Sequence, residues 1–94
     1  VESNFLQNIT FIKIDVEGFE YAVINGGKEA IQKHKPLLFI ELDDNNLKEN
    51  NSSALALVSL LCSLGYTKFY RTDNMSALST STDFSHCHYD MVAR

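Results

Sequence analysis

The sequence lacks long apolar runs, an excess of basic residues and abundant cysteine, and each shortage excludes a class of protein. No stretch approaches the roughly 20 apolar residues that span a bilayer. Eight basic residues against twelve acidic ones give a net charge of −4, which argues against a nucleic-acid partner because such partners attract a basic surface. With Cys62 and Cys87 as its two cysteines and no signal-peptide pattern, we expect free buried thiols and a reducing, cytoplasmic location.

What the sequence does contain is typical of a small globular domain. Its 94 residues are 45% hydrophobic and 21% charged, which excludes disordered and fibrous classes and allows one domain at most. Because the chain begins with Val1 and enters a strand almost at once, we expect residues 1–94 to be a single partial domain taken from a longer protein.

The first third of the chain alternates between strand and helix signals. Residues 11–16 alternate in the manner of a strand, and Gly18 ends that pattern. A short helix is expected at residues 19–25. A second is expected at residues 28–35, because paired glycines interrupt the first and Pro36 stops the second.

The rest of the chain continues this alternation. Residues 37–42 are almost continuously apolar, which predicts a strand buried on both faces, and residues 43–51 are typical of a polar turn. Ser52 or Ser53 can cap a helix over residues 54–64, which Gly65 ends. Residues 66–71 predict a third strand, 72–85 a loop and 88–93 a last strand. The predicted class is α/β, with three parallel strands, flanking helices and an antiparallel last strand.

Four segments together resemble a known family. They are residues 12–20 (IKIDVEGFE), 24–27 (INGG), 36–41 (PLLFIE) and 64–66 (LGY). This set is similar to the FkbM family of S-adenosylmethionine-dependent methyltransferases, most densely over residues 11–42. The Asp-Val-Glu-Gly-x-Glu hexapeptide is the most specific part, and the later Gly-Tyr adds weak support.

The resemblance implies a fold and a cofactor. The fold is the C-terminal half of a class I (Rossmann-like) methyltransferase domain, whose mostly parallel sheet binds S-adenosylmethionine at the carboxyl ends of its first strands. The chain contains no Gly-x-Gly turn to hold that cofactor. We therefore expect the cofactor-binding residues to lie upstream of Val1, and this piece alone to bind the cofactor poorly and to be inactive.

Four acids are candidates for the site. Asp15 and Glu17 follow the first strand, where an acid can accept a proton from a hydroxyl acceptor, and Glu20 is the third catalytic candidate. Glu41 ends the second strand at the same edge of the sheet and is a candidate substrate-binding residue. The alternative for Asp15 and Glu17 is that they cap the following helix, and for Glu20 that it stabilises the helix N-terminus.

Other residues of the sequence bear on metal binding and on alternative functions. Residues 86–88 (HCH) lack a second cluster at zinc spacing, and Asp43, Asp44 and Glu49 lack the calcium-loop spacing, so no metal site is predicted. The expected partner is a small molecule or sugar with a hydroxyl group, with no nucleic acid and no membrane. Two alternatives stay open: a non-catalytic α/β interaction module, and a magnesium-dependent nucleotide hydrolase fragment whose phosphate loop would lie upstream. The oligomeric state is not predicted.

Overall fold

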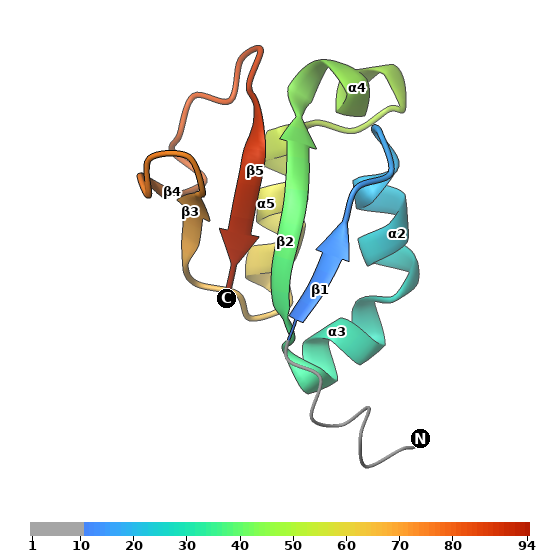
Figure 1. Ribbon diagram of the computed structural model, residues 1–94. Coiled ribbons are helices and arrows are strands. Elements are labelled where there is room, and N and C mark those ends of the chain that lie inside the picture. The colour runs from blue at the N-terminus through green and yellow to red at the C-terminus, as the bar shows by residue number, and fades with distance from the viewer. Residues whose placement is uncertain (1–10) are drawn as a thin grey trace.

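The computed structural model describes residues 11–94, which form one five-stranded sheet and four helices (Figure 1). The strands are β1 (Phe11–Ile14), β2 (Leu37–Asp43), β3 (Phe69–Arg71), β4 (Ala77–Leu78) and β5 (His88–Ala93). The helices are α2 (Glu20–Gly26), α3 (Lys28–His34), α4 (Asp44–Glu49) and α5 (Ala54–Ser63). The strand order across the sheet is β1-β2-β5-β3-β4.

Strand direction agrees in part with the prediction. β1 pairs with β2 in parallel, whereas β5 pairs in antiparallel fashion with both β2 and β3. β1, β2 and β3 therefore run in one direction and the last strand returns between β2 and β3. The α/β class is confirmed, but an extended parallel sheet is not seen in residues 11–94, because every ladder except β1–β2 is antiparallel.

Two predictions about irregular segments were wrong. Residues 43–51, expected as a turn, contain α4, whose first turn is capped by the Asp43 side chain accepting a hydrogen bond from the Asn46 amide. Residues 72–85, expected as a loop, contain β4, which pairs with β3 at Leu78 and Phe69. A cap and a two-residue ladder leave almost no periodic signal in a sequence.

Burial on β2 differs from the expectation of a strand buried on both faces. Leu38, Ile40 and Leu42 are fully buried, while the residues between them are half-buried. The reason is visible in Figure 1, where α5 lies behind β2 and β5, and no described helix lies on the face toward the viewer. The side chains buried behind the sheet include Ile14, Ile24, Leu38, Ile40, Leu42, Leu47, Leu57, Val58, Leu61 and Met91.

Helix α5 shows how local signals and packing agree. The Ser53 hydroxyl accepts a hydrogen bond from the Ala56 amide at 3.0 Å, as the sequence predicted. Gly65, immediately beyond the helix, has φ +102, a conformation that L side chains rarely adopt. Asp44, which is buried, accepts a hydrogen bond from the Ala54 amide and so fastens α4 to the start of α5.

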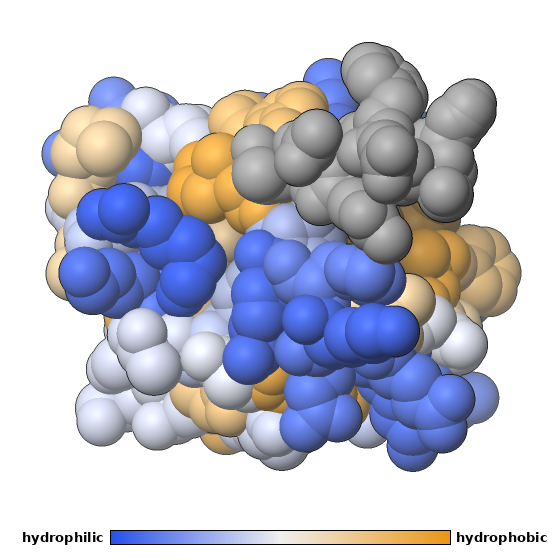
Figure 2. Space-filling view, turned by 90° about the horizontal axis from the view of Figure 1, so that it is seen from below, coloured by the Kyte–Doolittle hydropathy of each residue, from blue (hydrophilic) through white to orange (hydrophobic). Residues whose placement is uncertain are grey.

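β1 lies at the edge of the described sheet, where apolar side chains reach the surface. Among residues 11–94 it pairs with β2 alone, and Phe11, Phe19 and Val23 are about half exposed. Figure 2 shows hydrophobic patches among hydrophilic residues on the end of the molecule viewed from below.

No helix in the described part of the chain has the length and apolar character needed to cross a membrane.

Candidate functional site

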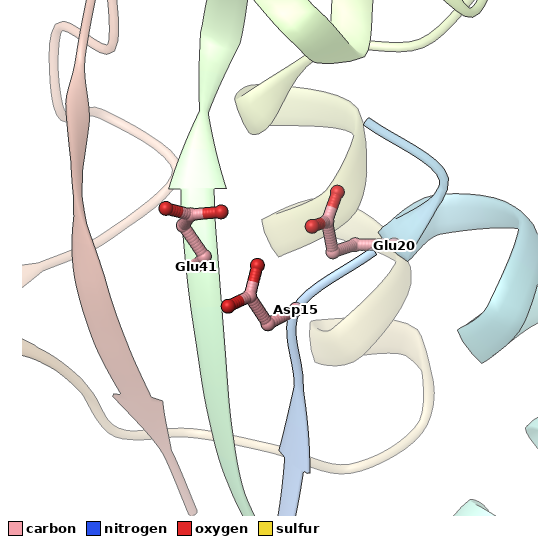
Figure 3. A group of neighbouring side chains, drawn as sticks. All are labelled: Asp15, Glu20 and Glu41. Carbon is pink, nitrogen blue, oxygen red and sulfur yellow. The ribbon is translucent and has the colours of Figure 1, made fainter. Parts of the chain in front are cut away.

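Asp15 and Glu41 are neighbours because β1 and β2 form the one parallel ladder of the described sheet. Ile14 pairs with Ile40, so the next residues in each strand's path, Asp15 and Glu41, lie side by side beyond that pair. Carboxylate oxygens of Asp15, Glu41 and Glu20 all lie within 4.8 Å of one another. Figure 3 shows Asp15 between the other two, with Glu41 on β2 and Glu20 at the start of α2. The prediction that Asp15 and Glu41 share one edge of the sheet agrees with this arrangement.

Glu20 is the buried member of this group, with 1% of its surface exposed. Its carboxylate accepts hydrogen bonds from the amide of Gly18 at 2.9 Å and from the amide of Val16 at 3.1 Å. The side chain therefore binds the turn between β1 and α2 from within. Charge-assisted hydrogen bonds of this kind hold a backbone more firmly than neutral ones, so Glu20 fixes the turn on which Asp15 stands.

The turn itself requires glycine at one position, and Glu17, which precedes that glycine, is not a member of the acidic group. Gly18 has φ +102, and a Cβ there would lie 2.7 Å from the Asn46 carbonyl oxygen of α4. Glu17 also has positive φ, at 48°, and is exposed. The predicted pair of Asp15 and Glu17 is thus replaced in space by Asp15 and Glu41, and the catalytic role of Glu17 stays a prediction.

The alternative that Asp15 and Glu17 cap α2 does not agree with the hydrogen bonds of the turn. At α2, whose N-cap is Phe19, the structure has no side-chain cap hydrogen bond among the described residues. Glu20 instead reaches back to amides that precede the helix. The acids at 15 and 17 therefore do not act as caps of α2 within residues 11–94.

The electrostatics of the group centre on Glu41. A hydrogen bond with Asp15 raises the pKa of Glu41 above its ordinary value, and partial burial adds to the rise, while the hydrogen bond with His88 acts in the opposite direction. The physical cause is that neighbouring carboxylates favour keeping one proton between them. Glu41 is accordingly the member of this group whose protonated form the surroundings favour.

His88, on β5, completes the surroundings of Glu41. Its Nε2 lies 3.2 Å from Oε2 of Glu41, and its Nδ1 lies 3.8 Å from Oδ2 of Asp43. The hydrogen bond with Glu41, and then the charge of Asp43, raise the pKa of His88. Sequence reasoning assigned no task to His88, and only the antiparallel register, which sets it opposite Asp43, brings it here.

A hollow of about 650 Å³ adjoins Asp15 on the β1 side. Its lining is mostly apolar and comes from β1, the residues after it, α2 and α3, and includes Asp15, Ile14, Val23 and Ile31. Most of a small molecule's contact surface in a binding site is apolar, with a few polar groups fixing its orientation. Asp15 is the one acid among the described residues that line this hollow.

Asp15, Glu20 and Glu41 lie close enough together to be candidate ligands of a metal ion, but Glu20 is already engaged by the backbone. Both oxygens of Glu20 already accept backbone hydrogen bonds, and this use competes with metal coordination. Of the HCH segment, His88 contacts Glu41, while the half-buried Cys87 places Sγ 3.8 Å from the Leu42 carbonyl oxygen. Both cysteines are free, as predicted, but Cys62 is exposed, so the expectation that it is buried was wrong.

Comparison with known proteins gives one match. A family model described as the methyltransferase FkbM domain matches residues 1–68. The matched range ends just before β3, so β3, β4 and β5 lie outside it. No curated protein and no solved structure matches the chain.

Proposed function

Because the chain belongs to the FkbM methyltransferase family, we propose that it supplies the acceptor side of an S-adenosylmethionine-dependent O-methyltransferase. The acceptor is a small molecule or sugar carrying a hydroxyl group. Asp15 accepts the hydrogen bond of that hydroxyl and takes up its proton. The observation that carries the proposal is the contact between Asp15 and Glu41 at the carboxyl ends of two parallel strands.

The position of this contact supports the proposal. In α/β sheets, ligands bind beyond the carboxyl ends of the strands, where the connecting loops separate. Asp15 stands there, exposed, on a turn fixed by Glu20, and it also lines the apolar hollow beside β1. A base that is rigidly held and accessible can orient a hydroxyl group, and orientation supplies much of the rate enhancement of a transfer between two bound reactants.

The direction of the strands supports the class I methyltransferase fold as a finer assignment. β1, β2 and β3 run in one direction, and β5 returns in the opposite direction between β2 and β3. A sheet that ends in a reversed strand is what the family resemblance implies for the second half of that fold. The described residues would then be the acceptor half of the domain.

The cofactor does not fit the described residues as its main binding site. Gly18 is the glycine after β1, but its open face is filled by Asn46 and Asn50 of the α4 region, with Asn50 Nδ2 only 2.5 Å from where a Cβ would stand. That glycine therefore serves the packing of this chain and offers no cradle for a nucleoside. S-adenosylmethionine supplies the methyl group in this family; residues 11–94 bind and orient the acceptor.

The proposal is tested by methyl transfer. The full-length product of the gene that encodes this chain is incubated with tritium-labelled S-adenosylmethionine and a panel of small hydroxylated acceptors and their amine analogues. We expect label in hydroxylated acceptors, as an O-methyl ether identified by mass spectrometry. Absence of transfer to every hydroxylated acceptor, or transfer to amines alone, would contradict the proposal.

A further inference from the structure

His88 is the one histidine of residues 11–94 that contacts the acidic group, and it takes no part in the proposed proton uptake by Asp15. It lies on β5, outside the residues that match the family model. Its side chain is 63% exposed and makes its two acidic contacts with β2, at Glu41 and Asp43. A side chain that packs so little has a small structural role, so its charge is the property to consider.

The charged groups that act on His88 within the described part of the chain all have one sign. Glu41 and Asp43 face it from β2, and Asp90 lies on its own strand; each favours the imidazolium, and together they raise the pKa of His88. Glu41 in turn has neighbours of both signs. Asp15 approaches it from the end of β1, His88 approaches it from β5, and Asp90 of β5 is its register partner. Asp15 and His88 therefore act on Glu41 in opposite directions.

We propose that His88 is a positioning residue for the acid pair: as an imidazolium it opposes the protonation of Glu41 that Asp15 favours, and so leaves Asp15 less engaged by a hydrogen bond from Glu41. This inference rests on the proposed function for its purpose, though not for its test. A hydrogen bond donated by a protonated Glu41 occupies an Asp15 oxygen that the acceptor hydroxyl needs. His88 touches neither the acceptor nor the cofactor and acts through Glu41.

The geometry fits this role better than direct catalysis. Nε2 of His88 lies 3.2 Å from Oε2 of Glu41, while Nδ1 lies 3.8 Å from Asp43, so both ring nitrogens face acids of β2. With both nitrogens protonated, the ring donates a hydrogen bond to Glu41 and presents its positive charge to Asp43. Loss of one proton from the His88 ring removes one hydrogen-bond donor. It also removes the positive charge that opposes the effect of Asp15 on the pKa of Glu41.

The test is a titration of Glu41 followed by carbon-detected NMR of its side-chain carboxyl group, in the full-length protein without cofactor or acceptor, between about pH 3 and 8. H88Q keeps a polar side chain and removes the charge, and H34Q is the matched control, because His34 is an exposed histidine on α3 that is not among the groups acting on Glu41. We expect H88Q to raise the Glu41 midpoint by roughly 0.2–0.7 pH units, the scale of an exposed ion pair. H34Q should leave it unchanged.

Three outcomes overturn the inference, two of them with H88Q and one with E41Q. One is a Glu41 midpoint that H88Q shifts no further than H34Q does. The other is a Glu41 midpoint that H88Q does shift, while the acidic limb of the pH profile of kcat, measured for H88Q in the full-length enzyme, stays unchanged. The reciprocal variant E41Q should lower the His88 midpoint, and a midpoint that stays in place would also count against the pair. Because the NMR samples contain neither cofactor nor acceptor, their result is independent of whether methyl transfer is found.

Discussion

At the scale of single residues, the structure separates acids that have the same appearance in the sequence. Asp15, Glu17 and Glu20 stand within six positions of one another, yet Glu20 is buried on backbone amides, Glu17 is exposed on the turn and Asp15 faces Glu41. Burial of an acid is costly unless hydrogen bonds compensate it. The amides of the turn provide that compensation for Glu20, so its task is to hold the loop.

Glu20→Ala tests this task. The substitution leaves the amides of Val16 and Gly18 without their buried acceptor, and we expect the free energy of unfolding to fall by about 2–4 kcal/mol, with a smaller loss for E20Q, which keeps one acceptor oxygen. Urea unfolding followed by circular dichroism measures the change. The exposed Glu49, replaced by alanine, should stay within roughly 0.5 kcal/mol. An E20A protein as stable as E49A would show that the turn does not depend on Glu20.

At the scale of elements, the junction between β1 and α2 depends on the close approach of α4. Gly18 lies against the backbone of α4 and has a positive φ, whereas Gly26, at the end of α2, has nothing within 4 Å of the place of its absent Cβ. The same change at these two glycines should therefore have opposite effects. This contrast separates a glycine that both its conformation and its neighbours require from a glycine that neither requires.

Gly18→Ala should lower the free energy of unfolding by about 2–4 kcal/mol, because a methyl group meets the Asn46 carbonyl oxygen in a conformation unfavourable for alanine. Gly26→Ala should raise it by roughly 0.5–1 kcal/mol, since alanine is the better helix former. Thermal and urea unfolding of both variants measure the effects. Equal changes for the two variants would mean that α4 does not restrict the turn.

The elements also show which features the sequence could predict. β1, β2, the Ser53 cap and the common edge of Asp15 and Glu41 follow from alternation, apolar runs and cap chemistry, all of which are local. The task of Glu20 could not be predicted, because a backbone amide leaves no mark on the sequence. The contact of His88 with Glu41 depends on the register between β2 and β5, because the two residues lie 47 positions apart.

At the scale of the whole molecule, one face of the sheet packs on helices and the other carries the candidate site. β2 is fully buried toward α5 and half-buried toward the face that bears Glu41 and Asp43. The Asp15–Glu41 pair therefore sits where a second layer, or a bound molecule, can reach it. The family assignment and this open face together favour an acceptor site built on the Asp15–Glu41 pair.

The turnover number of D15N, measured in the full-length product of the gene against a hydroxylated acceptor, tests this account most directly. The amide that replaces the Asp15 carboxylate keeps the size of the side chain but cannot take up the proton, and E49Q, which removes an exposed acid on α4, is the control. We predict that D15N lowers kcat about 10²-fold or more, the range of a lost general base, while E49Q stays within about twofold of the wild type. A D15N enzyme with the kcat of E49Q and an unchanged fold would contradict the account.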